Sequence, residues 1–299
     1  MEAPNYKCHF CNECLGTGCI NELPGMGGVN NNENFQLNCL AWKKYHLDTD
    51  SFLPFHEIQQ KLRLAPITGA KENIGYYSEE KFYEDFLKAA YNASLKLSIG
   101  DGYPQEKFLY GIKALQKLSE DYKTPIKAAV FLKPWENSKI FEEIEICSSF
   151  AEFIGIDIDA VDIITMKSCT SLERKTTEQL KAIQKKLTVP FVIKGIFSEQ
   201  DIELVKEVKP EIVVISNHGG RVPRKNGSTA DFLNHYGKTL AKYCQKIWVD
   251  GGIRTQRDIQ AAIKLGAEEI LLGRTCISAF CKDTEKGISQ YVKSLSTSN

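Results

Sequence analysis

From residue 62 onward, the 299-residue chain alternates short apolar runs with amphipathic stretches. Short runs rich in β-branched residues are typical of buried strands, and apolar residues three or four positions apart are typical of helices that pack on one face. The expected strands cover residues 62–67, 95–99, 126–132, 153–158, 191–194, 212–216, 247–250 and 270–272. The expected helices cover residues 79–93, 106–122, 139–150, 177–187, 199–208, 230–243 and 256–265, and an eighth follows from Cys276.

Strands that alternate with helices indicate parallel βα units, and eight such units close a (β/α)8 TIM barrel in a chain of about this length. An open doubly wound sheet is the alternative, but no Gly-x-Gly-x-x-Gly turn follows the first strand. Capping boxes mark three of the helix starts, namely Thr176 with Gln179, Ser198 with Asp201, and Thr255 with Asp258. We therefore predict an α/β barrel over residues 56–299.

Composition excludes several classes of protein. The 38 basic and 38 acidic residues cancel, so the chain offers no basic field for nucleic acid or an acidic membrane. The polar, cysteine-containing N-terminus does not read as a signal peptide, and no apolar run approaches the roughly 20 residues of a membrane span. We expect a cytoplasmic protein with reduced thiols and with neither nucleic-acid nor membrane partners.

The first 55 residues form a separate expected unit, a Cys-rich arm followed by a lead-in helix over 35–45. Cys8, Cys11, Cys14 and Cys19 give the spacing C-x2-C-x2-C-x4-C. Thiolates this close on a short irregular segment can converge on one metal, and both zinc and an iron–sulfur cluster use such ligands. Free thiols in an unstructured arm are the alternative. Cys39 is read as a buried apolar residue or a spare ligand.

Charged and glycine-rich residues follow five successive expected strands. In a barrel the carboxyl ends of the strands meet at one rim, so residues far apart in sequence share a pocket there. An imidazole can act as a base near neutral pH, and a guanidinium fork suits a carboxylate. The segments are Asp157-Ile-Asp159, Lys194-Gly195, Ser216-Asn-His218-Gly-Gly-Arg221, Asp250-Gly251-Gly252-Ile-Arg254 and Gly273-Arg274.

The last two segments predict a phosphate site, because glycine amides, an arginine and a helix start all favour an anion. Ordinary surface arginines are the alternative. Lys194 ends an apolar strand and needs an anionic partner. A period of two places Asp157 and Asp159 on one face of their strand, where one of them could orient His218; two hydrated carboxylates are the alternative.

These motifs resemble those of the FMN-dependent α-hydroxy-acid oxidase and dehydrogenase family, the group of glycolate oxidase and lactate oxidase. The match is strong over residues 189–274 and weaker over 62–159, where Ala65-Pro66-Ile67-Thr68 resembles the family's first strand end. The Cys-rich arm is outside the usual pattern and looks like an arm found in a branch of such proteins from anaerobes.

The resemblance implies a role for each motif. His218 takes a proton from the substrate, Arg221 holds the substrate carboxylate, Asp159 pairs with the histidine, and Lys194 stabilises negative charge on reduced flavin. Asp157 falls where the family usually has a threonine. The implied FMN-binding residues are Pro66, Ile67, Thr68, Ser98, Asp157, Lys194, Ser216, His218, Asp250, Gly251, Gly252, Arg254, Gly273 and Arg274.

The chain also departs from the family. The glutamine and tyrosine usual on the third strand are absent from residues 128–135, and the usual N-terminal substrate tyrosine has no clear counterpart. The family's second substrate arginine is also missing, with Lys133, Lys167 and Arg174 as candidate replacements, although a lysine replaces a bidentate clamp poorly. FMN binding is thus a firmer expectation than hydroxy-acid oxidation.

The expected function is FMN-dependent oxidation of a small 2-hydroxy acid to the 2-oxo acid, with an unknown electron acceptor. One alternative is an FMN barrel that isomerises or reduces another substrate, which would explain the lost tyrosines but not Arg221 beside His218. A second is an electron-relay flavoprotein whose arm carries an iron–sulfur cluster. The resemblance also implies a homo-oligomer.

Overall fold

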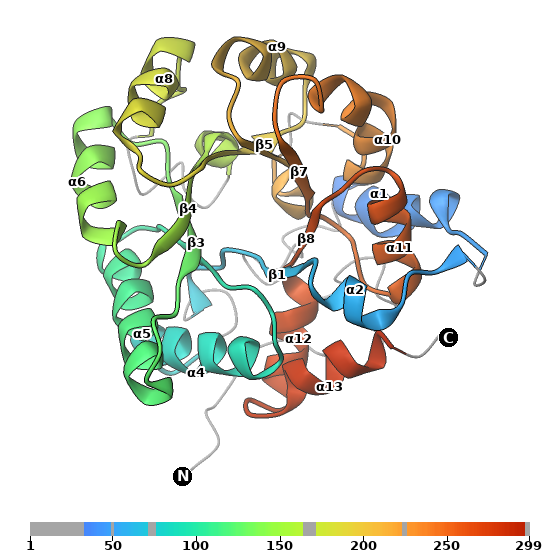
Figure 1. Ribbon diagram of the computed structural model, residues 1–299, viewed down its shortest axis with the longest axis horizontal. Helices are drawn as coiled ribbons and strands as arrows, with labels where there is room; N and C mark the ends of the chain where they lie inside the picture. Colours follow the sequence, from blue (N-terminus) through green and yellow to red (C-terminus); the bar gives the residue numbers. More distant parts are fainter. Residues whose placement is uncertain (1–32, 49–50, 71–75, 164–171, 223–225, 297–299) are drawn as a thin grey trace.

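The computed structural model describes residues 33–48, 51–70, 76–163, 172–222 and 226–296. Eight parallel strands form a nearly closed barrel surrounded by helices (Figure 1), which confirms the predicted (β/α)8 fold. The strands are β1 (Leu62–Leu64), β2 (Ser98–Gly100), β3 (Ala128–Leu132), β4 (Ala151–Asp157), β5 (Phe191–Ile196), β6 (Ile212–Ile215), β7 (Lys246–Val249) and β8 (Glu269–Leu272).

The strands pair in the order β1-β8-β7-β6-β5-β4-β3-β2. The first strand pairs with the last, with Leu62 opposite Ile270 and Leu64 opposite Leu272. On its other side, β1 forms a bridge between Arg63 and Lys96, which lies two residues before β2. The backbone N–H of Leu64 donates to the Lys96 carbonyl at 2.8 Å. This short seam completes the ring.

The outer helices begin and end close to the expected positions. Five helices begin at a serine or threonine whose side chain accepts a hydrogen bond from a backbone N–H of the first turn, an N–H that the helix itself leaves unpaired. These residues are Ser78, Thr176, Ser198, Ser228 and Thr255. The helices are α4 (Glu79–Asn92), α5 (Glu106–Tyr122), α6 (Asn137–Cys147), α8 (Thr177–Lys186), α9 (Glu199–Val208), α10 (Thr229–Leu240), α11 (Gln256–Lys264), α12 (Arg274–Lys282) and α13 (Gly287–Ser294).

Two apolar layers hold the barrel together. The larger layer lies between the strands and the ring of helices. The smaller one fills the inside of the barrel and includes Phe131, Val214, Trp248 and Leu271. The alternation of side chains along each strand supplies both layers, because successive residues point to opposite faces.

A buried arginine closes the amino-terminal end of the barrel. Arg63 is fully buried; its Nε donates to Glu269 at 2.6 Å and its Nη1 to Glu152 at 2.7 Å. Nη1 also donates to the Leu97 carbonyl at 2.6 Å, and the guanidinium lies 4.8 Å from the Trp248 ring centroid. These contacts join β1, β4 and β8, so the interior is packed and is not a pore.

The N-terminal part of the described chain lies against the barrel beside α10 and α11, where it is drawn in blue in Figure 1. It consists of α1 (Glu33–Ala41), the 3-10 helix η1 (Trp42–Tyr45) and α2 (Phe55–Gln59). The short helix expected over 35–45 is therefore present, split between α1 and η1. None of the helices in the described ranges is long and apolar enough to cross a membrane.

Candidate functional site

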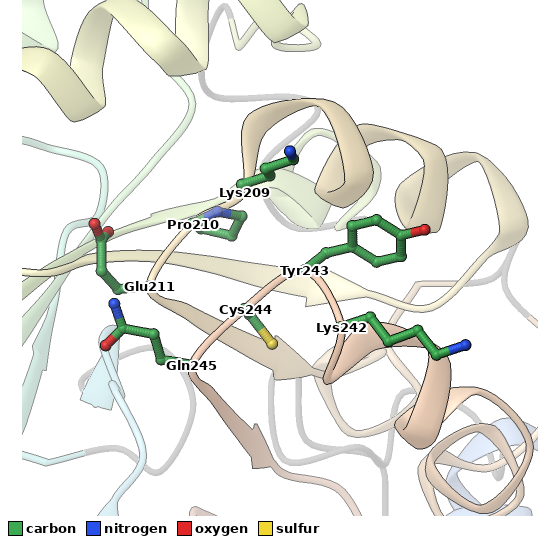
Figure 2. Close-up of a pocket in the computed structure, with 7 residues that line it drawn as sticks. All are labelled: Lys209, Pro210, Glu211, Lys242, Tyr243, Cys244 and Gln245. Carbon is green, nitrogen blue, oxygen red and sulfur yellow. The ribbon is translucent and has the colours of Figure 1, made fainter.

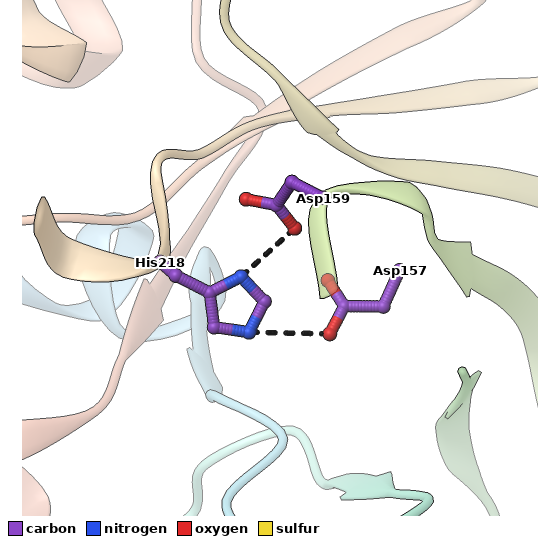
Figure 3. A group of neighbouring side chains, drawn as sticks. All are labelled: Asp157, Asp159 and His218. Carbon is purple, nitrogen blue, oxygen red and sulfur yellow. Dashed lines mark hydrogen bonds and ion pairs between the residues drawn. The ribbon is translucent and has the colours of Figure 1, made fainter. Parts of the chain in front are cut away.

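The ends of β3, β4, β5 and β6 bring five charged side chains together at the carboxyl rim. His218 contributes the centre: its Nδ1 lies 2.8 Å from Asp159 Oδ1 and its Nε2 lies 3.2 Å from Asp157 Oδ2. Lys133 Nζ lies 2.7 Å from Asp157 Oδ2, and Lys194 Nζ lies 3.0 Å from Asp157 Oδ1. We call these five residues the rim cluster. Figure 3 shows the imidazole between the two carboxylates.

A tight turn after β6 presents His218. Its φ is +54°, and Gly219 and Gly220 follow with φ of +61° and +90°. A non-glycine residue is uncommon in this left-handed region, so the surrounding structure must hold the turn. Asn217 Oδ1 accepts from the Gly220 N–H at 2.9 Å, and Ser216 Oγ accepts from the His218 N–H at 3.1 Å.

Asp157 and Asp159 reach the imidazole by a different route from the one predicted. The expectation was that a period of two along one strand places both on the same face. Instead β4 ends at Asp157, and Asp159 lies in the 3-10 helix η3 (Ile158–Asp162). The strict alternation was therefore wrong at this point, although both carboxylates face His218.

The position of the Asp159 carboxylate requires it to lie very close to the backbone of β5. A Cβ on Gly195 would lie 2.6 Å from Asp159 Cγ, and Gly195 has a φ of +100°. Only glycine fits that space and that backbone conformation. The glycine after Lys194 thus lets the carboxylate reach the imidazole.

The charges around Asp157 determine its ionisation. Burial alone would raise the pKa of this carboxyl, but His218, Lys133 and Lys194 outweigh burial and hold the pKa well below its usual value. Burial would lower the pKa of Lys194, but Asp157, Asp250 and Asp159 raise it above the ordinary lysine value. Both groups are therefore charged at neutral pH.

Asp250 extends the cluster toward the end of β7. Its Oδ2 lies 3.7 Å from Lys194 Nζ and accepts from Ser216 Oγ at 2.8 Å. Burial raises the pKa of Asp250, and Lys194 and Ser216 offset only part of that effect. Burial lowers the pKa of Arg221, while the negative charges of Asp157 and Asp159 oppose the shift. Arg221 therefore lies within electrostatic reach of the same two carboxylates as His218.

The site has the donor atoms of a metal centre but not the charge of one. Donor atoms of Asp157, Asp159 and His218 lie within 4.8 Å of one another. However, each Asp157 oxygen already faces a lysine ammonium group, and a dication would be repelled by both. Two carboxylates can accept from one imidazole only when both ring nitrogens carry a proton. The two carboxylates therefore suit an imidazole that gains a proton rather than a metal ion.

Two arginines, one after β7 and one after β8, contact the ring of Phe35. The Arg274 guanidinium lies 4.1 Å from the Phe35 ring centroid and that of Arg254 lies 5.5 Å from it. Burial lowers the pKa of Arg274 to about 9, and the like charge of Arg254 adds to the shift. Arg274 still carries its charge at neutral pH. Two guanidinium groups that contact the same aromatic ring suit a phosphate or another anion.

Four buried polar atoms along this rim have no hydrogen-bond partner among the described residues: Ser98 Oγ, Asp159 Oδ2, Asp250 Oδ1 and Arg254 Nε. Buried polar atoms are nearly always paired in folded proteins, so these atoms indicate a polar ligand. FMN fits them, because its phosphate suits the arginine pair, its ribityl hydroxyls suit Asp250, and its ring suits Lys194 and Ser98. The residues present thus fit the cofactor that the resemblance implies.

The remaining predicted flavin contacts also lie at the rim. A Cβ on Gly100, at the end of β2, would lie 3.1 Å from Thr68 and 3.3 Å from Pro66, which places the 66–68 segment beside the second strand end. Ile67 packs partly buried against the core. A Cβ on Gly273 would lie 3.6 Å from Ala65. The loops after β1, β2 and β8 therefore adjoin one another.

Two of the three candidates for the missing arginine lie in the described ranges, and of these Lys133 reaches the cluster and Arg174 does not. Arg174 pairs with Asp162 at 2.9 Å and its side chain is 60% exposed. Lys167 lies outside the described residues, as do the four N-terminal cysteines. Cys39 is buried, and its Sγ accepts from Arg254 Nη2 at 3.4 Å.

Sequence reasoning missed the contribution of α1. Phe35 stacks on Arg274, Asn38 Nδ2 donates to Asn217 Oδ1 at 2.7 Å, and Trp42 Nε1 donates to the Gly251 carbonyl at 2.9 Å. No local pattern around residue 38 signals a contact with residue 217. The glycines at 220, 251 and 252 were the available signal, because their lack of a side chain leaves room for another segment.

A separate pocket of about 320 Å³ lies at the opposite end of the barrel (Figure 2). It is lined by the loops that precede β6 and β7, residues 209–211 and 242–245. Barrel enzymes place their chemistry at the carboxyl ends of the strands. This pocket lies at the amino ends and contains none of the rim cluster.

Comparison with solved structures supports the fold. A structure of a mandelate oxidase variant with benzoyl-formic acid aligns with a TM-score of 0.65 and 19% sequence identity, and covers 88% of this chain and 82% of that one. A second, with (S)-mandelic acid, gives a TM-score of 0.63 at 18% identity, and covers 88% of this chain and 82% of that one.

Sequence comparison finds similarity to FMN-dependent enzymes. Residues 151–298 match the model of the FMN-dependent dehydrogenase family. The chain is 32% identical to 2-hydroxyacid oxidase 2 of Rattus norvegicus over 111 residues, which cover 37% of this chain and only 31% of that protein. It is 25% identical to 2-hydroxyacid oxidase of Dictyostelium discoideum over 224 residues, 74% of this chain and 51% of that protein. These matches support membership in the FMN-dependent α-hydroxy-acid oxidase and dehydrogenase family, with the family model covering residues 151–298 of this chain.

Proposed function

We propose that this protein binds FMN at the carboxyl rim and oxidises a small 2-hydroxy acid to the 2-oxo acid. The observation that carries the proposal is the rim cluster, in which His218 lies between Asp157 and Asp159 with Lys194 beside them. The relatives named as 2-hydroxyacid oxidases support the substrate class. When bound, FMN supplies a two-electron acceptor.

The protein's own groups handle the proton and the carboxylate. His218 Nε2 takes the proton of the 2-hydroxyl group, while Nδ1–H stays bonded to Asp159, which fixes the orientation of the ring. Before that, Asp157 must release Nε2. Asp157 can do so and remain neutralised, because its two oxygens also face Lys133 and Lys194.

The same geometry stabilises the protonated product of this step. The imidazolium that forms lies between two carboxylates, since the structure places Asp159 beside Nδ1 and Asp157 beside Nε2. Arg221, which is partly buried and on which the charges of Asp157 and Asp159 act, binds the carboxylate of the substrate through its guanidinium fork. With FMN bound, Lys194 would supply positive charge that favours a negatively charged flavin.

The overall charge of the site supports an anionic substrate. With an uncharged histidine the charges cancel, and with an imidazolium one positive charge is left. After His218 has taken the proton, the monoanionic carboxylate balances that charge, whereas a neutral ligand would not. The charged groups counted are Asp157, Asp159 and Asp250 against Lys133, Lys194 and Arg221.

The test is anaerobic mixing of FMN-loaded protein with a panel of 2-hydroxy acids. We expect the yellow absorbance of the flavin to bleach with at least one acid. His218→Ala should bind FMN and stay yellow, but should bleach at least 100-fold more slowly, the range that loss of a general base produces. If no acid bleaches the wild-type flavin, the proposed substrate class is wrong.

Binding and metal analysis test the rest. Protein that stays colourless after incubation with FMN would exclude the cofactor. Measuring the metal content distinguishes the three hypotheses for the N-terminal cysteines: zinc indicates a zinc site, iron with sulfide indicates an iron–sulfur cluster, and no metal indicates free thiols. The electron acceptor, a homo-oligomeric state and a cytoplasmic location stay predictions from the sequence.

A further inference from the structure

Helix α1 contacts three loops of the candidate site although it precedes the barrel in sequence. A Cβ on Gly220, after β6, would lie 2.5 Å from the Phe35 backbone nitrogen. A Cβ on Gly252, after β7, would lie 2.0 Å from the Asn38 carbonyl oxygen. The third loop, after β8, contributes Arg274 over the Phe35 ring. The helix backbone therefore rests directly on two glycine turns.

The Phe35 ring covers the flat faces of two arginines and shields those faces from solvent. It does not cover the N–H groups at the edges of the guanidinium groups. A guanidinium over an aromatic face gains cation–π energy, and its N–H groups stay free to bind in the plane. Arg254 Nε is buried without a partner among the described residues, and Arg254 Nη2 has only the weak acceptor Cys39 Sγ at 3.4 Å. Phe35 thus contacts both positive charges. Arg274 Nη2 already donates to the Gly219 carbonyl at 2.6 Å, so Arg254 Nε is the buried donor that an anion would pair.

Asn38 restrains the turn that carries His218. This side chain is fully buried, donates to Asn217 Oδ1 at 2.7 Å and accepts from the Thr229 N–H at 2.9 Å. The same Asn217 oxygen accepts from the Gly220 N–H at 2.9 Å. Because residues 218–220 all have positive φ, this turn needs such external restraint to persist.

We propose that α1 is a wall of the cofactor site, in which Phe35 positions the arginine pair for the FMN phosphate and Asn38 positions the His218 turn. The first part rests on the proposed FMN binding. Ordering the two arginines in advance saves the cofactor the entropy of immobilising them. The expectation is specific: Phe35 affects recognition of the phosphate and leaves recognition of the isoalloxazine ring unchanged.

The test compares FMN with riboflavin, which has the same ring and no phosphate. Dissociation constants come from quenching of flavin fluorescence. We expect Phe35→Leu to lower the affinity for FMN roughly tenfold, the size of a desolvated cation–π contact, with little change for riboflavin. Phe35→Tyr keeps the ring and should keep the preference. Leu40→Ala is the control, because Leu40 is an exposed residue of the same helix.

The ratio of the two affinities decides the outcome. An unchanged ratio in Phe35→Leu overturns the proposal, and this includes equal loss of both ligands through poor folding. Tighter FMN binding would also overturn it, since Phe35 would then compete with the phosphate. A wild-type protein that binds FMN no better than riboflavin refutes the phosphate site itself. A wild-type flavin that no acid bleaches refutes only the substrate class.

Amide hydrogen exchange tests the role of Asn38. Asn38→Asp keeps the acceptor for the Thr229 N–H and loses the donor to Asn217. We expect exchange at least several-fold faster in peptides that cover residues 216–222, with unchanged exchange in β3 and at the start of α10. Equal exchange in the 216–222 peptides of the variant and the wild type would remove Asn38 from the proposal. Faster exchange throughout the barrel would show a merely structural role and would also count against it.

Discussion

Replacing Asp157 with asparagine removes a negative charge that faces two lysines and His218. The contacts are 2.7 Å to Lys133 Nζ, 3.0 Å to Lys194 Nζ and 3.2 Å to His218 Nε2. Each such contact corresponds to roughly 5 kcal/mol at an effective dielectric constant of about 20. Desolvation of the buried ions, several kcal/mol for each, offsets most of that sum.

We therefore expect Asp157→Asn to destabilise the fold by about 3–5 kcal/mol at pH 7, the range for an uncompensated buried charge. Asparagine has nearly the same shape, so the loss reports charge and not packing. Lys133→Gln in the Asp157→Asn background removes one unpaired cation and should recover part of the loss. Glu203→Gln is the control: the Lys206–Glu203 pair has side chains 33% and 66% exposed and should contribute little.

The pH dependence gives a second check. The pKa of Asp157 is lowered in the folded state, so its contribution is present above the unfolded value of about 3.9 and is lost as the pH falls through the folded value. Urea unfolding from pH 8 to pH 5 should show a constant difference in the free energy of unfolding between wild type and Asp157→Asn. The gap should narrow only below about pH 4. A variant as stable as wild type at pH 7 would refute the ion cluster.

Two further predictions concern buried groups. Gly195→Ala places a Cβ 2.6 Å from Asp159 Cγ, whereas a Cβ on Gly266, which has a similar φ of +104° against +100°, meets nothing within 4 Å. In urea unfolding, we expect Gly266→Ala to lose about 1–3 kcal/mol of stability from backbone strain alone and Gly195→Ala to lose more. Gly195→Ala should also slow flavin bleaching in anaerobic kinetics. Burial and then the charge of Asp101 raise the pKa of Glu143 to about 8, so the folded state keeps a proton that the unfolded state releases, and stability falls as pH rises from about 4.3 to 8. Glu143→Gln should therefore be more stable than wild type at pH 8, with the gain vanishing near pH 4; a gain independent of pH would show that Glu143 does not titrate in this range.

Much of the barrel could be predicted because each βα unit carries its own local signal. The helix over 106–122 was predicted with the bounds that the structure shows, and the boxes at Thr176 and Thr255 form as expected. At Ser198 the side chain caps the helix, but Asp201 bonds the Phe197 N–H instead of closing the box. Period and capping depend on neighbours in sequence, so they can be read directly from it.

The candidate site could be predicted only in part, because its assembly depends on contacts distant in sequence. The carboxyl-rim rule brought His218, Lys194 and Asp157 together correctly. It could not show that Lys133 would share an Asp157 oxygen with the histidine. Nor could it show that Phe35 would lie over Arg274, which is 239 positions away (274 − 35). Those details follow from packing, which a local pattern does not encode.

Arg63 implies an order of events during synthesis of this protein. Its partner Glu269 is 206 positions further along the chain, and β1 pairs with β8. At a translation rate of roughly 5–20 residues per second, β1 waits about 10–40 s on the ribosome for the strand that completes the ring. Until β8 emerges, the Arg63 guanidinium, which is buried in the finished barrel, lacks its partner Glu269, and the edge of β1 that pairs with β8 is open. A nascent chain that stops before residue 269 should therefore need a chaperone, or aggregate, however well its earlier units are formed.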